Sequence, residues 1–196
     1  MKRFALIALV LAAVSCSEDP NKNWTFAEKA LIVDPDPVMR VLTIDNRKDS
    51  LILRTPSQDL PAELVASSEY KSLEQKLIAT VTSPDQDGVG IAAPQVGLLR
   101  RVVAVQRLDK EGEPFEVYPN IRVIRTRGEM APGGEGCLSV PNRRGEVLRY
   151  QNIDISYTSP FTLKDTVETV LGFTAVIFQH ETDHLDGILY IDKLAD

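Results

Sequence analysis

The two histidines of the chain lie four residues apart near its C-terminus, in the stretch His180-Glu181-Thr182-Asp183-His184. On a helix, residues at this spacing lie about 6 Å from one another on one side, so two imidazoles can converge on a single metal ion. The pattern is HExxH, whose glutamate acts on the water that the metal activates. Because the pattern is short and core histidines are common without a metal, a third ligand must decide its meaning.

Most known sources of a third ligand do not fit this chain. Thermolysin-like enzymes take a glutamate from a later helix, but only twelve residues follow His184, and they include the helix-ending Gly187. Metzincins extend the pattern to HExxHxxGxxH, and here Tyr190 stands where their third histidine belongs. A soft upstream ligand remains in Cys137, within the run "GGEGCLSVP". A buried thiol taken alone is more often a small apolar residue than a ligand.

Three segments together resemble, in the right order, the signature motifs of the peptide deformylases. They are "GVGIAAPQ" (88–95), "EGCLS" (135–139) and "QHETDHLDG" (179–187). The resemblance covers roughly residues 40 to 194, since it continues through "PNRRGEVLR" after the cysteine and "GFTAVIF" before the first histidine. It implies the peptide deformylase fold and metal-dependent hydrolysis of N-formyl-methionyl peptides to formate and a free-amine peptide.

The same resemblance implies one divalent metal ion held by Cys137, His180 and His184. The family typically uses Fe²⁺, and Zn²⁺, Ni²⁺ or Co²⁺ can replace it. The spacing of the ligands does not choose among these ions.

Further residues have roles that the resemblance implies. Glu181 would take a proton from the attacking water and deliver it to the departing amine. The side-chain amide of Gln95 and the backbone N–H of Leu138 would stabilise the oxyanion. Residues of the first motif would contact the substrate, through an apolar pocket for the methionine side chain and through the backbone at the central glycine: Val89, Gly90 and Ile91.

The helix that carries the histidines is expected to begin near Gly172 and to stop at Gly187, a natural left-handed position just past a helix end. Residues at helical spacing share one face of this segment: Phe173, Val176, Ile177, His180 and His184. The histidines should therefore point inward, toward the apolar core.

Other elements must hold this helix in place. Thr25 and Glu28 form a capping box that predicts a helix start, and a longer helix is expected from Pro61 through the apolar positions Leu64, Tyr70, Leu73, Leu77 and Val81. Short β-type runs are expected at 101–106, 115–124, 145–150, 153–158 and 165–171. Strands in succession without βαβ alternation favour an α+β fold, with antiparallel sheets packed around the C-terminal HExxH helix.

The N-terminus is typical of a bacterial lipoprotein signal. Lys2 and Arg3 precede the apolar run 4–14, which is too short to span a bilayer comfortably, and "AVSC" resembles a lipobox ending at Cys16. We expect a signal peptide at 1–15, a tether at 16–24 and one catalytic domain at 25–196. The expected location is outside the cytoplasm, lipid-anchored at Cys16 on the periplasmic or outer-membrane side, and the alternative is cytoplasmic.

The charge and the cysteine content limit the kinds of partner and disulfide that this chain can have. The net charge of −6 and the scattered basic residues argue against a nucleic-acid partner. Removal of the signal and lipidation of Cys16 would leave one free thiol, so no intramolecular disulfide is expected. We also expect the protein to be a monomer. Two rival functions stay open: an exported metallopeptidase or amidase with the same site, and a peptide-binding lipoprotein without turnover. Glu181 and Gln95 argue against the second, since a pure binder requires neither.

Overall fold

The computed structural model describes residues 22–195. The expected signal peptide and Cys16 lie outside the described residues. Within the described range, no helix has the length and apolar character that crossing a membrane requires.

Five α-helices and two 3₁₀ turns form the helical part of the described chain. They are α1 (Phe26–Val33), α2 (Arg47–Leu53), α3 (Ala62–Val65), α4 (Ser68–Val81), η1 (Ala93–Val96), α5 (Gly172–Leu185) and η2 (Tyr190–Asp192). The capping box at Thr25 and Glu28 is confirmed. The single helix expected from Pro61 is wrong, because the Ser67 side chain accepts a hydrogen bond from the Tyr70 N–H and caps a separate helix, α4.

In residues 22–195, eight strands pair in antiparallel fashion in three groups. One sheet has the order β1-β2-β3 (Gly90–Ala92, Val102–Gln106, Phe115–Pro119). A second has the order β4-β7-β8 (Arg122–Thr126, Asn152–Thr158, Asp165–Leu171), and β5 (Met130–Cys137) forms a long hairpin with β6 (Val140–Tyr150). The α+β class and the antiparallel pairing are confirmed.

The strand expected over 115–124 is divided at Asn120, which has φ +58°. Its side chain donates to the Leu60 carbonyl at 2.8 Å and to the Thr158 hydroxyl at 3.0 Å. Asparagine tolerates this left-handed conformation better than most residues. The chain therefore turns here, and its two halves join different sheets as β3 and β4.

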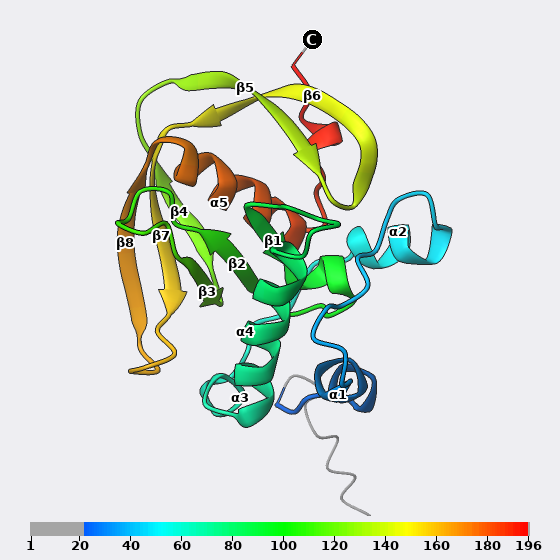
Figure 1. Ribbon diagram of the computed structural model, residues 1–196. Coiled ribbons are helices and arrows are strands. Elements are labelled where there is room, and N and C mark those ends of the chain that lie inside the picture. Colours follow the sequence, from blue (N-terminus) through cyan, green and yellow to red (C-terminus); the bar gives the residue numbers. More distant parts are fainter. Residues whose placement is uncertain (1–21, 196) are drawn as a thin grey trace, which may run out of the picture.

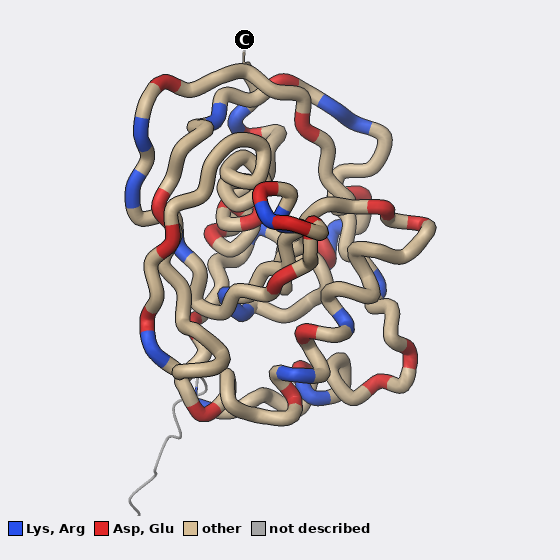
Figure 2. Tube along the Cα trace, turned by 60° about the vertical axis from the view of Figure 1, so that its left-hand side comes forward, with Lys and Arg blue, Asp and Glu red and all other residues tan. Residues whose placement is uncertain are grey.

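Helix α5 lies in the middle of the molecule and contacts strands of both sheets and the hairpin (Figure 1). One apolar cluster packs α4 against β1 and β2, and a second packs α5 against the two sheets. The β5–β6 hairpin arches over α5, with a third cluster between the hairpin and η2. In the view of Figure 2, acidic and basic residues are interspersed along the chain.

Candidate metal centre and active site

Helix α5 brings both histidines to the inside of the molecule, as its apolar spacing predicts. Glu181 and His184 are buried, and His180 is nearly so. The helix ends before Gly187, which has φ +73° and whose Cβ position would lie 2.6 Å from the carbonyl oxygen of Arg54. A side chain at Gly187 would therefore collide with backbone, which explains the glycine at this position.

Cys137 reaches the histidines from the end of β5. It pairs with Val140 across a tight turn formed by Leu138 and Ser139. The Ile44 N–H donates to the Ser139 carbonyl at 3.0 Å, so the turn is also fixed from outside the hairpin. This turn points the thiol toward α5.

The three expected ligands converge. Ligand atoms of Cys137, His180 and His184 all lie within 4.8 Å of one another, and the Cys137 Sγ lies 3.2 Å from His184 Nε2. The two imidazole rings are 5.1 Å apart between centroids. One cation placed among these atoms can contact a sulfur and two nitrogens at once.

Two side chains for which the sequence had suggested no role support His180. Its Nδ1 lies 2.7 Å from Glu135 Oε2, and Arg149 donates to both oxygens of Glu135, at 2.7 and 3.0 Å. Burial opposes the charged form of Glu135, but the hydrogen bonds with His180 and Arg149 outweigh it and hold its pKa at about 2. Glu135 thus fixes the ring so that Nε2 faces the other ligands.

Buried polar atoms at the centre lack partners within the described chain. They are Glu181 Oε2 and His184 Nδ1. Burial raises the pKa of Glu181 to about 7 and lowers that of His184 well below its usual value. Burial also opposes a charge on His180, yet hydrogen bonds to Cys137 and Glu135 outweigh it and raise its pKa to about 10.

These surroundings fit a bound divalent cation. The site stabilises positive charge at His180, and its donor set of one thiolate and two imidazoles suits Zn²⁺ or Fe²⁺ better than Mg²⁺ or Ca²⁺. A cation would lower the pKa values of its neighbours through its own charge.

Gln95 is held beside the thiol by its own turn, η1. Its side-chain oxygen accepts from the Ala92 N–H at 2.8 Å, which directs the amide nitrogen toward Ser139 Oγ at 3.2 Å and Cys137 Sγ at 3.6 Å. The backbone carbonyl of Gln95 accepts a hydrogen bond from the Leu42 N–H. The amide donor is therefore fixed in place before any ligand arrives.

A cavity of about 650 Å³ opens onto the centre. Its lining includes most of the expected site residues: Val89, Gly90, Gln95, Cys137, Leu138, His180 and Glu181. The prediction that Ile91 lines the pocket is wrong. Its side chain is fully buried in the apolar cluster between α4 and the strands β1 and β2. Side chains alternate along a strand, so Ile91 and its neighbour Ala92 point to opposite sides of β1.

The fold and the donor set define a class of protein with an HExxH helix, a cysteine as third metal-binding side chain and a cavity beside them. The family model described as polypeptide deformylase matches residues 38–196. The chain belongs to the peptide deformylase family.

Individual relatives agree with this assignment. The chain is 34% identical to a peptide deformylase of Leptospira biflexa, over 80% of this chain and 88% of that relative. A relative in Symbiobacterium thermophilum is 35% identical over 72% of this chain, and the match spans 65% of that protein. The actinonin-bound class I type b peptide deformylase of Acinetobacter baumannii superposes with a TM-score of 0.70 at 32% identity, covering 81% of this chain and 99% of that chain. That enzyme is also known with Met-Ala-Ser bound.

Proposed function

We propose that this protein removes the formyl group from N-formyl-methionyl peptides and releases formate and a peptide with a free amine. The observation that carries the proposal is the convergence of Cys137, His180 and His184 beside the buried carboxylate of Glu181. Membership of the peptide deformylase family supports the same reaction.

Cys137, His180 and His184 would hold one divalent ion, with Fe²⁺ as the proposed metal and Zn²⁺, Ni²⁺ or Co²⁺ as substitutes. When bound, the ion supplies Lewis-acid chemistry, which acidifies a water molecule and polarises a carbonyl. Glu135, hydrogen-bonded to His180, orients one ring for this role.

Glu181 would move the proton that the hydrolysis requires. Its carboxylate takes a proton as water adds to the formyl carbon, and it returns a proton to the nitrogen as the C–N bond breaks. Burial raises the pKa of this carboxyl group to about 7 in the absence of a metal, and the charge of a bound cation would lower this pKa and favour the proton-accepting carboxylate.

Gln95 and Leu138 would stabilise the charge that develops on the formyl oxygen. The Gln95 amide already points toward the thiol, and Leu138 follows that cysteine directly in the turn. A fixed donor of this kind is worth about 3 kcal/mol in the transition state.

The substrate chain would lie along β1, an edge strand of its sheet, with Gly90 offering its backbone and Val89 contributing apolar surface. The binding of actinonin and Met-Ala-Ser by the Acinetobacter baumannii enzyme supports a peptide in the corresponding cavity here.

We further propose that the protein is exported as a monomer and anchored by lipid at Cys16. The charged start, short apolar run and small residues before this cysteine support the anchor. Formylated peptides already outside the cytoplasm would then be its substrates. Mass spectrometry of the N-terminal peptide from the native host tests this location, and an intact Met1 in the cytosolic fraction would refute it.

The reaction is tested by formate release from formyl-Met-Ala-Ser under anaerobic conditions, with metal content measured on the same sample. We expect formate to appear in proportion to bound metal. Acetyl-Met-Ala-Ser and unmodified peptides serve as controls for general amidase or peptidase activity. Cleavage of these controls without formate release would refute the proposed reaction.

A further inference from the structure

The loop at the start of β6 carries two adjacent arginines at the mouth of the cavity. Cys137 pairs with Val140, but the preceding residue of β5, Gly136, pairs with Arg144. The residues between these two pairs on β6 bulge out of the hairpin, with Asn142 at φ +59°. Arg143 lies in this bulge and Arg144 follows it, and both are exposed and line the cavity.

Neither of these arginines pairs with a carboxylate in the described chain, a property that they share only with Arg47 among the described arginines. Every other described arginine except Arg47 lies within 4.0 Å of an acidic side chain. A guanidinium group presents a planar set of donors that matches a carboxylate, so arginines at the cavity mouth without a carboxylate partner in the described chain can bind a carboxylate of a ligand.

The distance from the metal centre suits a short peptide. Arg144 Nε lies 3.8 Å from the Cβ position of Gly136, the neighbour of Cys137, which places it no more than about 9 Å from the Cys137 Cα. An extended peptide advances about 3.3 Å per residue, so a group on the second or third residue after the formyl group comes within reach.

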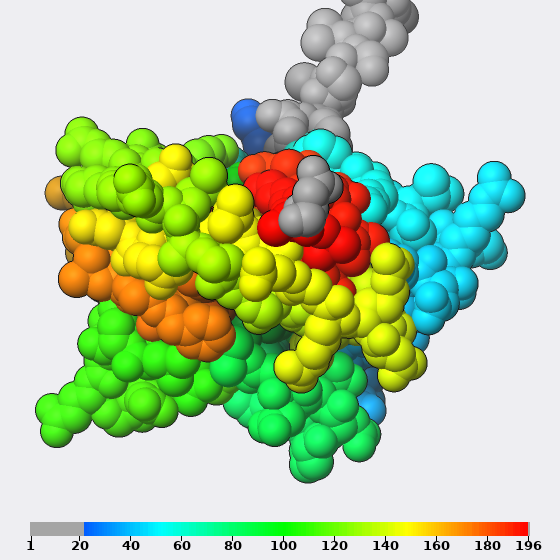
Figure 3. Space-filling model, turned by 90° about the horizontal axis from the view of Figure 1, so that it is seen from above, coloured from blue at the N-terminus to red at the C-terminus, as the bar shows by residue number. Residues whose placement is uncertain are grey.

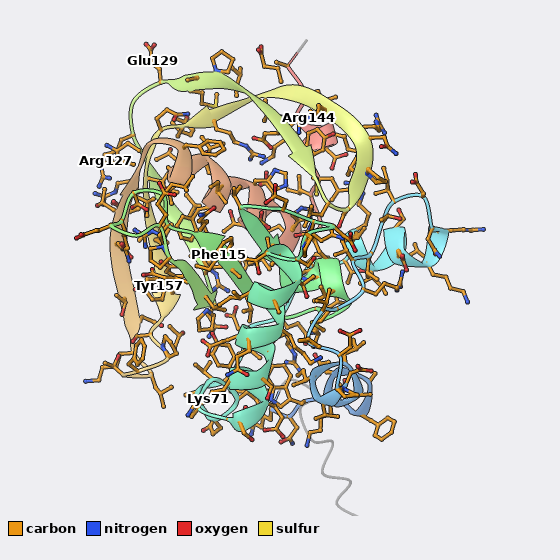
Figure 4. All side chains as sticks on the ribbon, viewed as in Figure 1. Lys71, Phe115, Arg127, Glu129, Arg144 and Tyr157 are labelled. Carbon is orange, nitrogen blue, oxygen red and sulfur yellow. The ribbon has the colours of Figure 1, made fainter. Side chains whose placement is uncertain are left out.

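The cavity runs from the buried metal centre to the protein surface, and the two arginines lie at its outer end. Its inner end contains the buried Gln95 and Glu181, and its outer end contains the exposed Asp87, Arg143 and Arg144. Figure 4 places Arg144 on the hairpin that arches over α5, and in Figure 3 yellow side chains of β6 project beside green atoms of an earlier segment. Asp87 would repel an anion, so a carboxylate must bind on the hairpin side.

We propose that Arg143 and Arg144 bind a carboxylate of the substrate, two or three residues beyond its formyl group. The carboxylate is either the C-terminus of a short peptide or an acidic side chain. The inference rests on the proposed deformylase function and narrows its substrates to short acidic or released formyl peptides.

The test compares kcat/KM for two matched pairs of peptides with the full chain. One pair is formyl-Met-Ala-Ser and its C-terminal amide, and the other is formyl-Met-Ala-Glu-amide and formyl-Met-Ala-Gln-amide. We expect the charged member to be preferred about fivefold, the upper range for an exposed ion pair, and the preference to fall as ionic strength rises. Preference within the first pair alone identifies the C-terminal carboxylate as the ligand, and preference within the second identifies an acidic side chain.

Variants connect the preference to the loop. R143Q/R144Q should bring both ratios close to one, R143K/R144K should keep part of the preference, and R47Q, an exposed arginine on α2, should leave the ratios unchanged. Equal rates within both pairs for the wild-type protein, or an unchanged preference in R143Q/R144Q, would overturn the inference. Absence of formate from all of these peptides would instead overturn the proposed function itself.

Discussion

Replacement of Gly90 by alanine tests whether close packing of β1 on α5 positions the proton carrier. The added Cβ would lie 2.6 Å from Glu181 Oε1 and 2.9 Å from Ile177 Cγ2. Both neighbours are buried, so the carboxylate must rotate or the strand must move by several tenths of an ångström. Overpacking of this kind typically costs about 1–3 kcal/mol of unfolding free energy.

The loss of activity should exceed the loss of stability. Misplacement of a catalytic group by about 1 Å can lower the rate about 100-fold, so we expect Gly90→Ala to lower kcat for formate release by about that factor with metal still bound. Gly133→Ala is the matched control, since its Cβ would meet nothing within 4 Å. The assay is formate release together with thermal unfolding and metal content. If kcat in Gly90→Ala stays within a factor of about three of the wild type, the positioning argument is refuted.

Further variants test the metal centre and the frame around it. Cys137→Ala should lower metal affinity by more than about 100-fold with the fold intact, and Glu135→Gln by about 10- to 100-fold, as measured by competition with a chelator; normal metal binding in either would contradict its assignment. Glu28→Gln removes the carboxylate that Arg100 contacts at 2.6 Å and should cost about 3 kcal/mol of unfolding free energy near neutral pH. Burial opposes the ionised form of Glu28, but hydrogen bonds from Arg100 and Thr25 outweigh it and lower its pKa below 4.5. This stabilisation is therefore complete above about pH 4.5 and is lost as the pH falls through the lowered pKa, so the difference between wild type and variant in urea titrations should shrink only in acid.

Local sequence signals predicted the element that carries the chemistry. The apolar spacing of Val176 and Ile177 placed both histidines on the inner face of one helix, and the structure confirms it. The same expectation for Phe173 is wrong, because this residue lies in the first turn of α5 and is 56% exposed. Such a signal works because a helix must bury one stripe of side chains whatever else surrounds it.

Other elements depend on contacts that no local pattern reveals. The glycine-rich strand β5 has weak strand propensity and forms through its pairing with β6, so it was missed. The break at Ser67 was signalled by its capping side chain, but the apolar periodicity on either side hid it.

The support of the metal centre could have been predicted in part. Glu135 stands two residues before Cys137 on a strand, and side chains two apart share one face. Recognition of β5 as a strand would therefore have placed Glu135 beside the thiol. Arg149 pairs with Ala131, four residues before Glu135, so its contact with Glu135 comes from the shape of the folded hairpin and not from a local pattern.

The most direct test of the central claim is the turnover of Glu181→Gln with its metal content measured on the same sample. Glutamine keeps the shape of the side chain but cannot accept a proton, and Glu181 is not among the three converging ligands. We predict metal content close to that of the wild type and a loss of formate release of at least about 100-fold. Formate release at the wild-type rate by the metal-loaded variant would contradict the account.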